Sequence, residues 1–189
     1  AVGFCALKSN TTGTNNTALG RNALSSNTTG ATNTAVGDQA LVSNTIGFNN
    51  ASLGYKSMVL NTTGQDNVAV GFCALALNTI GYINVAVGSR AMCANTTGRA
   101  NTAVGYQAML ANTTGLANTA LGTNSLNTNT IGGFNTAIGF LLASKYINDS
   151  VIVDGDDIMV TLQSGEIKKA SVSIAKPDNG AVLIHTGIN

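Results

Sequence analysis

The chain has 189 residues, enough for one ordinary domain or two small ones. Only 9% of them are charged, against about 25% in ordinary soluble domains, and the formal net charge is +1. This balance argues against a nucleic-acid partner or an anionic membrane surface found by electrostatic attraction. No apolar run approaches the ~20 residues of a membrane span, so no membrane insertion is expected. No signal peptide is visible, and the chain opens within a repeat without Met, as expected of a processed product or a piece of a longer protein.

A repeat of 17 residues dominates the chain from its first residues to about residue 140. The glycine of an AVG or ALG triplet recurs at this step: Gly3, Gly20, Gly37, Gly54, Gly71, Gly88, Gly105, Gly122 and Gly139. An asparagine column keeps the same step: Asn10, Asn27, Asn44, Asn61, Asn78, Asn95, Asn112 and Asn129. Spacing without a single insertion is typical of a solenoid. We therefore predict an all-β solenoid, a β-roll or β-helix, of eight coils over residues 1–140.

Within each repeat, the elements follow in a fixed order. Gly-x-x-Ala predicts a tight turn with two exposed central residues, followed by a small and a large residue such as Ala23 and Leu24. Asn-Thr-Thr-Gly-x-x-Asn predicts a broader corner, in which glycines and asparagines adopt positive φ. A short strand then leads to the next triplet. Two glycines and several Asn and Thr residues per repeat exclude a useful helix. Successive copies should stack about 4.8 Å apart, with the asparagine amides in ladders.

The apolar pattern of the repeat predicts an oligomer. Neighbouring strand residues point to opposite faces, yet pairs such as Ala18–Leu19 and Ala23–Leu24 are apolar at both positions. A coil can hide one of these faces, and the small alanine columns would permit a second chain to cover the other. We expect a homo-oligomer, most simply a homotrimer around the rod axis. The alternative is a monomer whose Gly-x-x-Ala turns rotate both residues inward.

The segments NTTGTNNTALGRNAL (10–24) and NTTGLANTALGTNSL (112–126) resemble tandem repeats of bacteriophage tail-fibre proteins. They are more distantly similar to the head repeats of trimeric autotransporter adhesins, whose repeat is shorter than 17 residues. The resemblance covers about residues 1–140. It implies a trimeric β-solenoid fibre on a virion or outside the cell, which attaches to a host surface and contacts other virion proteins.

Residues 141–189 depart from the repeat and carry more charge. The segment SVIVDGDDIMVTL (150–162) predicts two strands around an Asp-Gly turn, and KPDNGAVLI (176–184) contains a further hairpin signal. We interpret this region as a small β-rich cap or connector that covers the open end of the solenoid. A receptor-contacting tip and the start of another trimeric segment are the alternatives.

The reactive side chains predict neither a catalytic site nor a metal site, and no cofactor is expected. Asp154, Asp156 and Asp157 match a calcium loop only loosely, so a solvated turn is the better interpretation. His185 is the only histidine and has no partner cluster. Three cysteines complete this set: Cys5 and Cys73 share a column four coils apart, beyond disulfide reach, and Cys93 occupies another. We expect free thiols, with contact across an oligomer axis as the alternative.

Five copies of the corner motif contain a glycosylation sequon of the N-x-[ST] kind: Asn10, Asn27, Asn61, Asn95 and Asn112. In the other three copies isoleucine replaces the required hydroxyl residue (Ile46, Ile80 and Ile131), yet the corner recurs. A selected glycan site would keep its hydroxyl. The motif therefore predicts a packed corner of the repeat.

These observations favour a structural and attachment fibre. Variable aromatic residues next to the triplet glycine could contact a glycan or protein of the host surface: Phe4, Tyr55, Phe72, Tyr106 and Phe140. They could equally be single exposed residues without a partner. A second hypothesis, an ice- or surface-binding solenoid, follows from one threonine column: Thr11, Thr28, Thr45, Thr62, Thr79, Thr96, Thr113 and Thr130. A glycan depolymerase needs paired carboxylates, but residues 1–140 contain only Asp38 and Asp66, in different columns.

Overall fold

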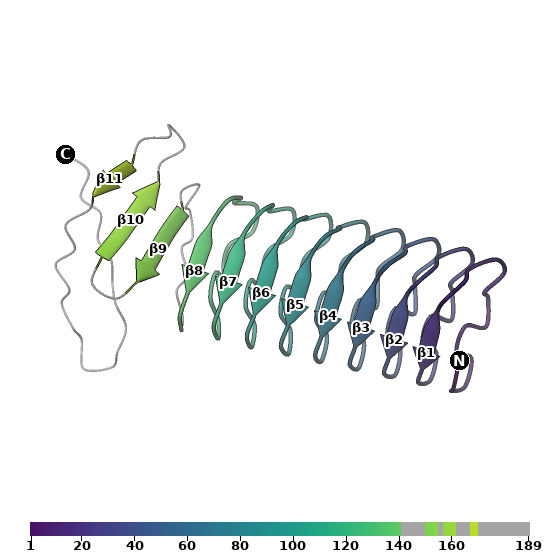
Figure 1. Cartoon of the computed structure of the whole chain (residues 1–189). Helices are drawn as coiled ribbons and strands as arrows, with labels where there is room; N and C mark the ends of the chain where they lie inside the picture. Colours follow the sequence, from purple (N-terminus) through teal and green to yellow (C-terminus); the bar gives the residue numbers. More distant parts are fainter. Residues whose placement is uncertain (141–149, 155–156, 162–166, 170–189) are drawn as a thin grey trace.

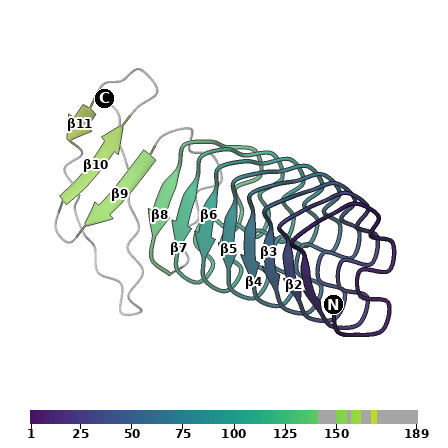
Figure 2. The same ribbon diagram turned by 45° about the vertical axis from the view of Figure 1, so that its right-hand side comes forward.

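A computed structural model of the chain describes residues 1–140, 150–154, 157–161 and 167–169. Residues 1–140 wind into a parallel β-solenoid with one strand per turn, so that about seven turns separate its first strand from its last (Figures 1 and 2). The strands are β1 (Thr17–Leu19), β2 (Thr34–Val36), β3 (Ala51–Leu53), β4 (Val68–Val70), β5 (Val85–Val87), β6 (Thr102–Val104), β7 (Thr119–Leu121) and β8 (Thr136–Ile138). The all-β, solenoid and repeat predictions are confirmed.

The strands pair in strict register, each residue with its equivalent one repeat later. In β1 and β2, for example, Ala18 pairs with Ala35 and Leu19 with Val36. At about 4.8 Å per rung, β1 and β8 lie about 34 Å apart. An insertion in one rung would shift every later side chain to the wrong column, which explains the unbroken spacing of the sequence.

The turn side of each rung consists of three successive tight turns. In the second rung the N–H groups of Ala23, Ser25 and Asn27 donate to the carbonyls of Gly20, Asn22 and Leu24, at 3.3, 3.2 and 3.1 Å. Asn22 and Leu24 adopt left-handed backbone conformations, with φ of 58° and 51°. This alternation turns both Ala23 and Leu24 into the interior, where both are fully buried.

The two apolar pairs of the repeat therefore behave differently. Ala23 and Leu24 both point inward, as the monomer alternative predicted for the turn. The strand pair alternates: Ala18 is buried, whereas Leu19 is 48% exposed. The idea that the alanine columns admit a second chain is wrong, because these alanines fill the narrow interior of the coil. The outward leucine and valine column is the apolar face that remains.

The core lies inside the coil and combines apolar and amide side chains. Its largest apolar members come from one column: Leu24, Leu41, Met58, Leu75, Met92, Met109 and Leu126. Two buried asparagine columns flank it, exemplified by Asn27 and Asn33. Their amides are hydrogen-bonded from rung to rung, except for the buried Asn135 Oδ1 at the last rung, and these bonds offset the cost of burying them.

The Asn-Thr-Thr-Gly corner corrects the prediction about positive φ. The corner glycines, such as Gly30, do not adopt positive φ; a Cβ at Gly30 would collide with the carbonyl oxygen of Gly47 in the next rung and with Asn27 Oδ1. The left-handed residue of this corner is instead the second one after the glycine, such as Thr32 with φ of 56°. Close stacking of backbones, rather than backbone conformation, therefore requires this glycine.

Three further strands follow the solenoid: β9 (Ser150–Asp154), β10 (Asp157–Thr161) and β11 (Ile167–Lys169). They form an antiparallel sheet in the order β11-β10-β9, in which Asp157 pairs with Asp154. The Asp-Gly turn between β9 and β10, His185, and the hairpin expected within 176–184 lie outside the described residues. The role of 141–189 as a cap, connector or tip stays a prediction.

Candidate functional site

The first candidate surface is the edge at which each strand ends. We call it the turn-edge row, and it consists of Phe4, Arg21, Asp38, Tyr55, Phe72, Ser89, Tyr106, Thr123 and Phe140. Each member follows a triplet glycine whose φ lies between 129° and 138°, a conformation that other residues avoid. All five aromatic members proposed from the sequence are exposed, from 42% at Tyr55 to 76% at Phe4.

Neighbours in the turn-edge row contact each other at two places. Arg21 and Asp38 form a salt bridge of 2.8 Å, and this hydrogen bond and charge raise the pKa of the Arg21 guanidinium. Tyr55 and Phe72 stack with ring centroids 5.6 Å apart and planes 9° from parallel, and Lys56 Nζ lies 5.2 Å from the Tyr55 centroid. These two rings cover each other, so they offer less free face to a sugar than the sequence suggested.

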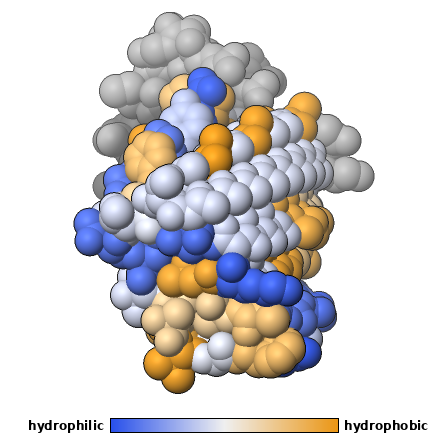
Figure 3. Space-filling view, turned by 90° about the vertical axis from the view of Figure 1, so that its right-hand side faces the viewer, coloured by the Kyte–Doolittle hydropathy of each residue, from blue (hydrophilic) through white to orange (hydrophobic). Residues whose placement is uncertain are grey.

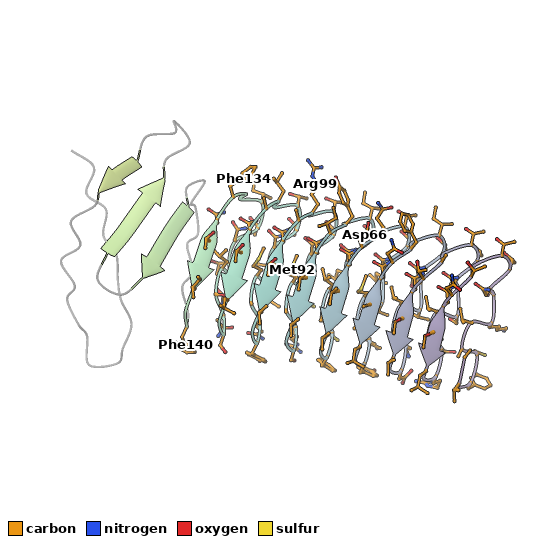
Figure 4. The ribbon with its side chains drawn as sticks, viewed as in Figure 1. Asp66, Met92, Arg99, Phe134 and Phe140 are labelled. Carbon is orange, nitrogen blue, oxygen red and sulfur yellow. The ribbon has the colours of Figure 1, made fainter. Side chains whose placement is uncertain are left out.

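A second aromatic surface, which sequence reasoning missed, lies on the opposite edge. We call it the corner row; its larger members are Phe48, Tyr82, Ile83 and Phe134, all at least 36% exposed. Figure 4 shows Phe134 along one long edge and Phe140 at the other, with Met92 between them. Arg99 lies 5.9 Å from the Tyr82 ring centroid. In the sequence, the columns of this row also mix aromatic, charged and small residues, which is the pattern that indicated exposure of the turn-edge row.

The third surface is the outer face of the sheet. Its strand-face column, the last residue of each strand, is apolar in every rung: Leu19, Val36, Leu53, Val70, Val87, Val104, Leu121 and Ile138. Four members are 46–49% exposed and the valines are half-buried. The other outward strand position holds only Thr, Ala or Val. In the view from the N-terminal end, near-neutral and apolar side chains cover much of the visible surface, and hydrophilic ones gather in patches (Figure 3).

The asparagines of the corner motif are structural. Asn61 Nδ2 donates to Asn44 Oδ1 at 2.8 Å and to the carbonyl of Gly64 at 3.1 Å, and its Oδ1 accepts from Asn78. Asn27, Asn61, Asn95 and Asn112 are fully buried sequon residues. An amide nitrogen that is buried and donates twice is not accessible to a glycosylating enzyme in the folded protein.

The threonine column on which the ice-binding hypothesis rests also forms hydrogen bonds within the rod. The hydroxyl of Thr28 donates to the carbonyl of Thr45 at 3.1 Å, and the same bond recurs between successive members from Thr11 to Thr130. The hydroxyl protons are therefore used within the rod. An ordered water layer would find acceptors but few free donors along this column.

The remaining reactive groups do not assemble. Asp38 is paired with Arg21, and Asp66 accepts a hydrogen bond from Asn49 Nδ2 at 3.0 Å. Among the described residues no three His, Cys, Asp or Glu side chains lie close enough to hold a metal ion. No helix there is long and apolar enough to cross a bilayer.

The three cysteines are free thiols and half-buried. Burial raises the pKa of the Cys93 thiol, and the charge of Cys73 raises it further, whereas Arg90 lowers it. A raised pKa leaves less reactive thiolate near neutral pH, so Cys93 lacks the environment of a nucleophile.

Comparisons of the chain with protein-family models, curated proteins and solved structures gave no match.

Proposed function

We propose that the chain is a structural fibre segment of a virion or extracellular appendage, most simply a phage tail-fibre shaft or distal segment that helps attach the particle to its host. The strand-face column carries the proposal. A regular rod with an uncharged apolar stripe along its sheet is suited to lateral assembly with copies that have the same rung spacing. A bacterial surface adhesin head is the alternative, and it would use the same assembly.

The occupant of the strand-face column is best supplied by two further copies of the chain, which makes a homotrimer. A partner that contacts all eight strands must place matching side chains at the spacing of the rungs. A second copy of the chain has this spacing because it forms the same solenoid. The half-exposed leucine and isoleucine side chains, together with the half-buried valines, give each chain a continuous apolar area along the rod for this contact. The adjacent Thr, Ala and Val column adds to this area.

Sedimentation equilibrium of the wild type tests this proposal, together with Val87→Lys. Val87 lies near the middle of the stripe, at the end of β5. We expect a trimer mass for the wild type and a monomer mass for the variant, because the interface would bury three unpaired ammonium groups. The lysine faces solvent in a monomer, so circular dichroism should stay unchanged.

Thr97→Lys is the matched control. Thr97 is exposed in the Asn-Thr-Thr-Gly corner, away from the strand face. This variant should keep the trimer mass. A folded wild-type monomer at micromolar concentration would contradict the assembly, and an equal loss of mass in both variants would contradict its location on the strand face.

No enzymatic activity is proposed. The only carboxylates in residues 1–140 are Asp38 and Asp66, and each is engaged by a different neighbour on a different edge. They do not form the pair that glycoside hydrolysis requires.

A further inference from the structure

From β4 onward, the turn-edge row alternates aromatic and small hydroxyl side chains. Phe72, Ser89, Tyr106, Thr123 and Phe140 follow one another, one rung apart. The aromatic rings therefore recur every second rung, about 10 Å apart on the strand spacing. All three are exposed, by 45%, 49% and 68% along the chain.

The small residues in this alternation leave space between the rings. Where two aromatic residues occupy adjacent rungs, as Tyr55 and Phe72 do, the rings stack on each other at 5.6 Å. Ser89 and Thr123 are too small to cover a neighbouring ring in this way. Tyr106 thus has a small neighbour in the row on both sides, and a flat apolar group can lie against it.

Hydrogen-bond donors flank the same rings. The residue after Ser89, Tyr106 and Thr123 is Arg90, Gln107 and Asn124 respectively, which supplies a guanidinium or an amide, whereas Cys73 follows Phe72. Their backbones are held rung to rung, since Gln107 N–H donates to the Ser89 carbonyl at 3.0 Å and Asn124 N–H to the Tyr106 carbonyl at 2.9 Å. Residues 71–140 contain no Asp or Glu. Aromatic platforms beside fixed donors suit a ligand with apolar ring faces and many hydroxyls.

The spacing selects the form of that ligand. An extended β-1,4-linked pyranose chain rotates by half a turn at each sugar, so equivalent ring faces recur once per disaccharide. This repeat is close in length to two rungs. A coiled α-1,4-linked chain does not present its rings at a constant interval along a straight line.

We propose that the turn-edge row from Phe72 to Phe140 is a binding site for an extended β-linked polysaccharide that lies parallel to the rod axis. Tyr106, Phe140 and the face of Phe72 that Tyr55 does not cover contact every second sugar, and the flanking guanidinium and amides donate to its hydroxyls. This site deepens the attachment role proposed above and rests on it.

Isothermal titration of the full chain with cellohexaose and chitohexaose tests the site, with maltohexaose as the coiled comparison. At least one of the two β-1,4-linked probes should bind, and maltohexaose should bind at least tenfold more weakly. Tyr106→Ser should weaken the β-linked binding at least tenfold. Tyr82→Ser, which removes an exposed tyrosine from the corner row, is the matched control and should bind as the wild type does.

Ser89→Tyr separates binding from folding. The new ring should fill the space between Phe72 and Tyr106 by stacking as Tyr55 does on Phe72, so binding falls while the melting temperature stays or rises. Absence of binding to both β-linked probes would overturn the site, as would equal affinity of Tyr106→Ser and the wild type. Neither result would alter the trimer mass, so the fibre proposal is tested separately.

Discussion

At the scale of single residues, the most demanding feature is the left-handed backbone of side chains that rarely adopt it. In each rung, one residue of this kind follows the turn-edge row and another is the large core residue; Leu41 and Met58, for example, have φ of 51° and 49°. A left-handed residue other than glycine costs roughly 1–2 kcal/mol. At the core position, complete burial of the apolar side chain offsets this cost. An exposed or half-buried turn residue gains less stabilisation from burial.

Gln39→Gly is therefore expected to stabilise the protein. Gln39 has φ of 59° in the third position of its turn and is half-buried. Glycine removes the left-handed strain but adds freedom to the unfolded chain, so the net gain should be about 0.5–1 kcal/mol. The midpoint of urea denaturation, followed by circular dichroism, measures it. Asn22→Gly serves as the control and should change the midpoint little, because asparagine tolerates this conformation.

At the scale of the repeated element, the glycine of the corner motif is the least replaceable position. A Cβ at Gly64 would lie 2.5 Å from the carbonyl oxygen of Gly81 in the next rung and against Asn61 Oδ1 in its own. Both oxygens take part in the amide ladder, since Asn61 Oδ1 accepts from Asn78 and the Gly81 carbonyl from Asn67 and Asn78. A methyl group here must separate two rungs and weaken several bonds together.

We accordingly predict that Gly64→Ala destabilises the protein by about 2–4 kcal/mol, from overpacking and lost hydrogen bonds. Thermal denaturation followed by circular dichroism checks the change. Thr63→Ala, at the exposed position next to it, should shift the melting temperature much less. Similar shifts for the two variants would mean that the corner relaxes around the extra methyl group.

The structure also shows which parts of the element could be predicted from sequence. The repeat length, the strand position and the Gly-x-x-Ala turn follow from columns that recur in every rung, and all three are observed. The sequence supported the inward rotation of Leu24 only as an alternative, because leucine carries no local preference for positive φ. Sequence reasoning therefore read the Ala23–Leu24 pair as a strand-like alternation. The resulting error placed the alanine columns at an interface instead of the core.

The candidate surfaces were predicted in part. The exposure of the turn-edge aromatics followed from the mixed occupancy of their column. The stacking of Tyr55 on Phe72 depends on ring orientation, which sequence does not specify. The corner row was missed because Phe48 and Tyr82 lie in one column and Phe134 in the next, so that neither column alone looks aromatic.

At the scale of the whole molecule, nearly every tertiary interaction of residues 1–140 joins one rung to the next. The strand pairs, both amide ladders and the threonine bonds connect residues 17 positions apart. Stability should then be a sum of similar rung and interface terms, as in other solenoids. The same arrangement explains why the charged composition can be so low: the amide ladders supply the polar order of the interior without ion pairs.

The removal of one complete rung tests this additivity. Deletion of residues 37–53 joins Val36 to Gly54, a junction identical to the natural Val36–Gly37, and every ladder is restored between the second and fourth rungs. Arg21 loses Asp38, an exposed pair worth about 0–1 kcal/mol. We expect a folded, shorter rod with an unchanged circular dichroism shape and a melting temperature only a few degrees lower.

Deletion of residues 37–52 instead retains Leu53 and shifts all later columns by one residue. Because that shift exchanges core and surface positions at the junction, this shorter deletion should unfold at a far lower temperature or not fold. If the two deletions were equally stable, the rung could not be the unit of this fold.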